Sequence, residues 1–258
     1  MPSTSTLPLE IEETILDLLA EDDEGHSTLR TCSLVCHAFL PICRKHTFGS
    51  IVLEDLWMVY ATHPFERLLR ETPEIADYIR KLEYNIRFVE MGLTISPSVQ
   101  ESLLKRISRL EFLTVLHGGG PKPYWGYVFP ALLHLLHLPT LTHFKVSDIN
   151  YFDVSDLIPC VNLKYLDVGD FTTGPKKNIL PAALPEHSNY LNEFVAGVGS
   201  STTIMKLCTA RRPDGKPIID FGSLSKIKMD IKGPNEHEAS QELFRRCHVL
   251  TNVKIFCK

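Results

Sequence analysis

Two groups of residues in this 258-residue chain have the types and spacing that chemistry would need. The first is the run His117-Gly118-Gly119-Gly120, whose glycines would let backbone N–H groups converge on an oxyanion during acyl transfer. That reaction also needs a nucleophilic serine in a Gly-x-Ser-x-Gly turn, and the chain contains no such turn. We therefore interpret residues 117–120 as a glycine-rich loop and predict that the protein is not an enzyme.

The second group consists of thiols and imidazoles between residues 32 and 46. Structural zinc sites usually contain a Cys-x-x-Cys pair, which the chain lacks. Cys32 and Cys36 are four residues apart on one face of a predicted helix, so we expect buried, reduced thiols there. The chain also has no P-loop and no Gly-x-Gly-x-x-Gly motif, and we expect neither a metal nor a cofactor. The group comprises Cys32, Cys36, His37, Cys43 and His46.

Helices must position these side chains, and the clearest helical pattern covers residues 8–20. Pro8 suits the first position of a helix, and apolar residues follow at i, i+4, i+7 and i+8, which is one stripe. The stripe consists of Ile11, Ile15, Leu18 and Leu19. We expect a second helix with Ser27 as its N-cap and a third over residues 42–48. Three such helices cannot bury all their apolar surface among themselves, so part of it should contact the rest of the chain or another protein.

In their order, these residues resemble an F-box of the type abundant in mushroom-forming fungi. The opening Leu7-Pro8-Leu9-Glu10-Ile11 and the later run Cys32-Ser33-Leu34-Val35-Cys36 match that pattern, and the aromatic Phe39 follows shortly. Two features depart from it. The connector over residues 22–27 is longer than in many F-boxes, and Phe39 stands where tryptophan is commoner.

The resemblance implies that the helices bind the Skp-type adaptor of a cullin–RING ubiquitin ligase, with apolar side chains filling a groove on the adaptor. The adaptor-binding residues carried over from the family pattern are Leu7, Pro8, Ile11, Ile15, Leu29, Val35, Cys36 and Phe39. We expect Leu18 and Leu19 to hold the small core of the helical module instead.

A different pattern repeats from residue 48 onward. An apolar-x-x-apolar-x-apolar unit recurs eight times at intervals of 22 to 33 residues, beginning at Phe48, Ile79, Leu110, Leu141, Leu163, Leu191, Leu224 and Leu250. Such a unit is typical of the strand of a leucine-rich repeat. Helical stripes between the units are expected over residues 65–76, 99–107, 131–138, 203–210 and 237–247.

We therefore predict an α/β protein of two parts. Residues 1–50 form a small three-helix F-box module, and residues 51–258 form an irregular leucine-rich-repeat-like α/β solenoid with a curved parallel sheet. The units lack an asparagine ladder, and no polar capping repeat follows the last of them. Degenerate repeats of this kind also fit the fungal F-box group.

A third surface candidate lies in the loop over residues 118–127. Its rings, Tyr124, Trp125 and Tyr127, would provide contact area at low entropic cost, which suits recognition of a target protein. The alternative is that the same rings simply cover the edge of the solenoid.

Composition limits the remaining classes of function. The chain is 44% hydrophobic and 22% charged, as globular proteins are, and its net charge of −4 includes no clustered basic face, so we expect no nucleic-acid binding. It has no run of about 20 apolar residues for a membrane span and no basic region for a signal peptide. We expect a cytoplasmic or nuclear protein that is not secreted.

The first hypothesis is thus a non-enzymatic substrate receptor of a Skp–cullin–F-box ubiquitin ligase, acting in ubiquitin-dependent protein degradation. The helices would bind the adaptor and the repeats would bind an unknown target. The alternative is a non-enzymatic repeat scaffold whose N-terminal helices only cap its own solenoid. An exposed apolar face around Ile11 and Ile15 would favour the first hypothesis.

Overall fold

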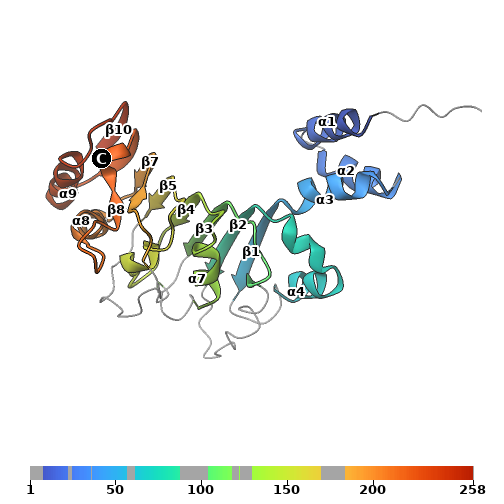
Figure 1. Cartoon of the computed structure of the whole chain (residues 1–258), viewed down its shortest axis with the longest axis horizontal. Helices are drawn as coiled ribbons and strands as arrows, with labels where there is room; N and C mark the ends of the chain where they lie inside the picture. Colours follow the sequence, from blue (N-terminus) through green and yellow to red (C-terminus); the bar gives the residue numbers. More distant parts are fainter. Residues whose placement is uncertain are drawn as a thin grey trace, which may run out of the picture.

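The computed structural model describes residues 8–22, 25–35, 37–56, 62–87, 104–117, 122, 130–169 and 184–257. Within these ranges the protein is α/β, with seven α-helices and an eight-stranded parallel sheet (Figure 1). The helices are α1 (Leu9–Ala20), α2 (Gly25–Val35), α3 (Phe39–Phe48), α4 (Thr62–Glu71), α7 (Pro130–Leu136), α8 (Ser201–Thr209) and α9 (Pro234–Phe244). Three 3-10 turns are η1 (Pro73–Asp77), η2 (Val154–Leu157) and η3 (Phe221–Ser223).

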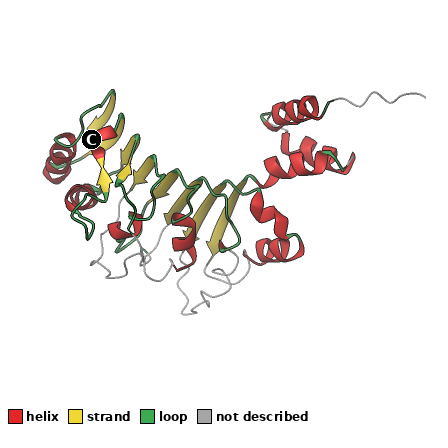
Figure 2. Cartoon of the chain, in the orientation of Figure 1, coloured by secondary structure: helices red, strands yellow, loops and turns green. Residues whose placement is uncertain are grey.

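The strands of the large sheet follow one another in chain order, so that each strand lies beside the previous one (Figure 2). They are β1 (Ser50–Leu56), β2 (Lys81–Arg87), β3 (Phe112–His117), β4 (His143–Val146), β5 (Tyr165–Val168), β7 (Glu193–Ala196), β9 (Lys226–Ile231) and β10 (Asn252–Cys257). A second, two-stranded parallel sheet pairs β6 (Asn189–Tyr190) with β8 (Ile219–Asp220).

The register confirms the eight predicted strand units residue by residue. The middle apolar residues of the units form one row across the sheet: Ile51, Leu82, Leu113, Phe144, Leu166, Phe194, Ile227 and Val253. The third residues form a parallel row: Leu53, Tyr84, Val115, Val146, Val168, Ala196, Met229 and Ile255. A shift of one residue would turn every apolar side chain to the other face, so burial of one face sets this register.

A repeated hydrogen bond marks the start of each strand. One carbonyl oxygen accepts two successive N–H groups from the next unit at distances of 2.8 to 3.1 Å, and this pattern occurs at all seven steps. The acceptors are the carbonyls of Gly49, Arg80, Glu111, Thr142, Lys164, Asn192 and Ser225. The chain therefore turns into each strand with the same geometry, although the segments between strands differ in length.

The two faces of the sheet differ in burial. Side chains alternate along β3, β4, β5 and β7, with every second one buried and the others half-exposed. The buried side chains join the helices and 3-10 turns in one large core, in which Phe144, Phe152, Phe194 and Phe221 are fully enclosed. On β10 even Val253 and Ile255, which belong to the inner rows, are exposed.

The predicted helices are confirmed in α1, α3, α7, α8 and α9, with shifted ends. The helix predicted over 65–76 is wrong beyond Glu71, because Pro73 cannot continue the helix and a 3-10 turn follows. Of the helix predicted over 99–107, the structure describes only residues 104–107.

Ser27 is not the N-cap of the second helix, which begins at Gly25 instead. The start of α2 lies against the end of α1, where the Gly25 N–H donates to the Asp22 carbonyl oxygen at 2.8 Å. A Cβ at residue 25 would lie 2.2 Å from the Leu19 carbonyl oxygen, so only glycine fits.

The helices α1, α2 and α3 have a core of their own. Leu16, Leu29, Ile42 and Cys43 are its buried members. This cluster shares no residue with the core of the sheet. Figure 1 shows α1–α3 beyond β1, at the opposite end of the row of strands from α9 and β10.

Candidate protein-binding surfaces

Helix α1 is apolar on two faces. Leu16 is buried, and Leu19 and Ala20 pack with it against α2 and α3. On the other face Ile11, Ile15 and Leu18 are 47%, 44% and 63% exposed. None of the three packs against either core of the described residues, so about half of the surface of this stripe is left to another contact.

The end of α2 presents a second apolar group. Leu34 is 87% exposed and Val35 is 71% exposed. Both lie in the last turn of the helix, after the buried turn around Leu29. Two adjacent aliphatic side chains at this exposure are costly in water unless a partner covers them.

Leu29 and Leu18 differ in burial from what the sequence pattern suggests. Leu29 is fully buried in the core of α1–α3, so its side chain is not available to an adaptor in this arrangement. Leu18 lies outside that core, contrary to the prediction, whereas Leu19 packs against it as expected. Leu18 is a further candidate contact because it is exposed and continues the stripe of Ile11 and Ile15.

The other predicted contacts have mixed positions. Pro8 is exposed directly before α1, and Phe39 is half-buried against the small core, where it supports α3. Leu7 and Cys36 lie outside the described residues, as do Tyr124, Trp125 and Tyr127 of the proposed target-binding loop.

Polar contacts join α3 to α1 and to the 3-10 turn η1. The imidazole Nε2 of His46, on α3, donates to the carboxylate of Asp17, on α1, at 2.6 Å, and Lys45 lies 3.4 Å from the same oxygen. The hydrogen bond from His46 lowers the pKa of Asp17, although burial opposes this, and Lys45 lowers it further. Arg44 in turn forms an ion pair of 3.0 Å with Glu74 in η1.

The open face of the sheet carries a row of stacked rings. Phe112, His143 and Tyr165 occupy the same register position on three adjacent strands. The ring centroids of Phe112 and His143 are 4.1 Å apart, and those of His143 and Tyr165 are 5.3 Å apart, with planes within 27° of parallel. Lys81, at the same position on β2, places its ammonium 5.0 Å from the Phe112 centroid.

Burial shifts the pKa values of the two titratable rings of this row, His143 and Tyr165. It lowers the pKa of His143, against the pull of Glu193 and Glu111, which favours the neutral imidazole. It raises the pKa of Tyr165 to about 12, with the nearby Asp167 acting in the same direction. The row is therefore an uncharged platform with a cation at its β2 end.

The apolar pattern of the units does not reveal this row, although the sequence contains a signal for it. In each repeat unit the residue directly before the middle apolar residue faces solvent. Aligning the units on their apolar residues places Phe112, His143 and Tyr165 in one column. The apolar positions of the units predict the strands, and the intervening positions carry the surface chemistry.

The cysteines and histidines form no metal site within the described ranges. Cys43, Cys160 and Cys208 are buried, and burial raises the pKa of Cys208 to about 12 and that of Cys160 well above its usual value. A protonated, enclosed thiol is a poor nucleophile and a poor ligand.

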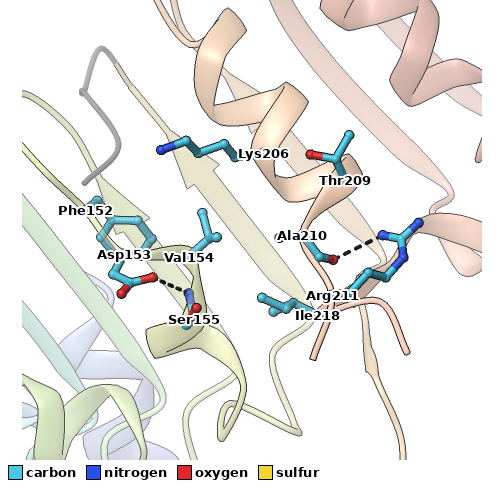
Figure 3. Close-up of a pocket in the computed structure, with 9 residues that line it drawn as sticks. All are labelled: Phe152, Asp153, Val154, Ser155, Lys206, Thr209, Ala210, Arg211 and Ile218. Atoms are coloured by element: carbon cyan, nitrogen blue, oxygen red, sulfur yellow. Dashed lines mark hydrogen bonds between the residues drawn. The ribbon is translucent and has the colours of Figure 1, made fainter. Parts of the chain in front are cut away.

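A cavity of about 230 Å³ lies between η2 and α8, on the side of the sheet that the helices cover (Figure 3). Its polar groups contact the chain itself. The Ser155 N–H donates to the Asp153 carboxylate at 2.9 Å, and Arg211 donates to the carbonyls of Cys208 and Ala210 at 3.0 and 3.1 Å. These contacts hold η2 and the end of α8 in place.

Within the described ranges, no helix combines the length and apolarity that crossing a bilayer requires. No protein-family model matches the chain, and a search of curated proteins gives no significant match.

Proposed function

We propose that the chain is the substrate-receptor subunit of a Skp–cullin–F-box ubiquitin ligase. In this account α1–α3 are an F-box module, and the eight strand units form a leucine-rich-repeat-like solenoid with a curved sheet. The module binds the Skp-type adaptor, and the sheet binds a target protein. The receptor acts by holding the target near the ubiquitin-loaded enzyme, which raises the effective concentration of the reacting groups without bond chemistry of its own.

The observation that supports the proposal is the second apolar face of α1. A helix that only capped its own repeats would turn its apolar residues inward. Here Ile11, Ile15 and Leu18 are exposed, while Leu16 on the other side already holds the helix in its core. A stripe at i, i+4 and i+7 is the arrangement by which an amphipathic helix fits a hydrophobic groove.

The family pattern adds the identity of the partner. The run Cys32-Ser33-Leu34-Val35-Cys36 is among the residues that carry the F-box resemblance, and Leu34 and Val35 are its most exposed described members. Leu34, Val35 and the α1 stripe supply apolar anchors, and the first turn of α1 adds the acidic side chains of Glu10 and Glu12.

Co-expression with a Skp-type adaptor from a mushroom-forming fungus tests the proposal. We expect the two proteins to elute together in size-exclusion chromatography, and we expect Ile11→Asp/Ile15→Asp to abolish the complex. The matched control is Val161→Asp/Val249→Asp, which adds the same charges at exposed valines away from α1–α3 and should leave the complex intact.

A wild-type chain that stays monomeric beside the adaptor would contradict the proposal. The alternative, a repeat scaffold whose N-terminal helices only cap its own solenoid, would then hold. Circular dichroism of each variant shows whether loss of the complex reflects lost contacts or lost folding.

A further inference from the structure

The solvent-facing side of the sheet combines the ring row with an unbalanced pair of lysines. Phe112, His143 and Tyr165 stack on one another and are half-buried, so their side chains are already ordered before any partner arrives. A partner that contacts them loses little side-chain entropy of the receptor. The exposed ring surface offers apolar contact area in the centre of the sheet.

Two ion pairs lie close to the His143 and Tyr165 end of the row, whereas Lys81 lies beside Phe112 at the other end. Lys145, on β4, lies 3.3 Å from Asp167, on β5, and Lys226, on β9, lies 3.9 Å from Glu193, on β7. Both pairs join neighbouring strands of the same face. The centre of the face is therefore close to electrically neutral.

The end of the face is different. Lys228 on β9 and Lys254 on β10 are direct register partners, so two ammonium groups project from adjacent strands on the same side. Lys228 lies 5.7 Å from the Phe256 ring, and no carboxylate of the described residues lies within 4 Å of either lysine. The nearest acidic position on this face is Asp230, two residues along β9. Like charges directly opposite each other destabilise a sheet, and an anionic partner would remove that cost.

We propose that this face binds an acidic peptide segment of the target protein, with an apolar side chain on the Phe112–His143–Tyr165 row and carboxylates at Lys228 and Lys254. The inference rests on the proposed function for the origin of the segment, since the target of the receptor supplies it. Binding itself needs only the sheet.

The dimensions suit one short segment. Two strand spacings separate β5 from β9, which is about 10 Å, because neighbouring strands lie about 4.8 Å apart. Lys228 also lies two residues, about 7 Å, beyond Lys226, the register position of Tyr165 on β9, so the separation is about 12 Å. About four residues of extended chain cover that distance at roughly 3.3 Å per residue. A segment with an aromatic or aliphatic residue and acidic residues a few positions away therefore reaches both features at once.

The acidic side chains on the same face disfavour a nucleic acid. Glu83, Asp167 and Glu193 are interspersed along the rows, and a phosphate backbone would meet them at intervals. A peptide places its few carboxylates at the lysine pair and leaves the rest of the face to apolar contact. Charge complementarity is thus local, and it fixes the direction of the segment.

A random dodecapeptide library displayed on phage tests the inference, with the full-length chain immobilised and no adaptor present. We expect the selected peptides to be enriched in Asp and Glu together with an aromatic or large aliphatic residue. Synthetic copies of them should bind about tenfold more weakly to Lys228→Glu and to His143→Ala. They should bind equally to Lys216→Glu, which reverses a lysine in the loop between α8 and β8.

Three results would overturn the inference: no enriched peptides, enrichment in basic residues, or peptides that bind Lys228→Glu and His143→Ala as they bind the wild type. Lys228→Glu changes an exposed side chain, so it remains informative if His143→Ala unfolds. The variant Ile11→Asp/Ile15→Asp separates this inference from the proposed function, because it should lose the adaptor and keep the peptide.

Discussion

The guanidinium of Arg44, on α3, lies 3.0 Å from the carboxylate of Glu74, in η1. This ion pair connects the small helical core to the first turn of the large one, although the two cores share no buried residue. Arg44 lies four residues before the end of α3, and β1 begins at Ser50. The ion pair therefore adds a second link to the covalent one between α3 and β1. Together the two links restrict the angle at which α1–α3 leave the sheet.

The contribution of this pair to stability should be small. The side chains of Arg44 and Glu74 are 27% and 51% exposed, and ion pairs in such positions contribute about 0.2–1 kcal/mol. A double-mutant cycle of Arg44→Met and Glu74→Gln, followed by urea unfolding, should give a coupling energy in that range. It should shrink in high salt, and a coupling above about 2 kcal/mol would contradict the account.

Leu29→Ala should unfold the helices without unfolding the sheet. Leu29 is fully buried in a core that contains three other buried residues, and such a truncation costs about 2–5 kcal/mol. Hydrogen exchange should lose protection over residues 25–48 and keep it in β3–β5. Val35→Ala is the matched control, because Val35 is exposed and its truncation should change stability by less than about 0.5 kcal/mol.

The contact between His46 and Asp17 should make the stability of the helices depend on pH at the acid end. The pKa of Asp17 is below its ordinary value of 3.8 in the folded protein, chiefly because His46 donates to it, with burial opposing. The stabilisation that this contact gives to the helices is therefore fully present above pH 3.8. It is lost as the pH falls through the lowered pKa of Asp17.

Hydrogen exchange over residues 9–48 at increasing urea concentration gives the unfolding midpoint of the helices. Comparing this midpoint between the wild type and Asp17→Asn at several pH values checks the dependence. The difference between them should be small, because Asp17 is half-exposed, and it should disappear in strong acid. A difference that grows as the pH falls would have the wrong sign.

Arg212→Met should destabilise the C-terminal part of the sheet. The Arg212 guanidinium is buried and donates to the carbonyl oxygens of Pro185 and His187 and, at 2.7 Å, to the carboxylate of Asp214. Removing it takes the donor from two partly buried carbonyls, and a hydrogen bond to a charged group contributes about 1.5–3 kcal/mol. Thermal unfolding should show a clearly lowered Tm, and Lys216→Met in the same loop should show none.

Much of the fold could be predicted from the sequence because one residue pattern sets it. Leu82, Leu113 and Phe144 must all face the core, and a strand offers only two faces, so their spacing fixes both the strands and their register. The same reasoning fails for α1, where Leu16 and Ile15 are both apolar but lie on different faces. Periodicity shows that a helix has an apolar stripe, and the neighbouring helices decide which stripe is buried.

The remaining differences between the predictions and the structure arise from local packing. The second helix begins at a glycine, because the end of α1 leaves no space for a Cβ at residue 25. Capping preferences alone do not predict such a contact. The ring row required the relative positions of three strands that are about 22 to 31 residues apart in the chain. Side chains of this kind are found by aligning units on their buried positions and then considering the exposed ones.

Calorimetric titration of the purified chain with a Skp-type adaptor from a mushroom-forming fungus tests the central claim most directly. We expect saturable binding of one adaptor per chain with a negative heat-capacity change, because apolar surface at Ile11, Ile15, Leu34 and Val35 leaves water on binding. Leu34→Asp/Val35→Asp should remove the heat of binding, and Val161→Asp/Val249→Asp should leave it unchanged. An absence of binding by the folded wild-type chain, or equal binding by both double variants, would contradict the claim that α1 and α2 form an adaptor-binding surface.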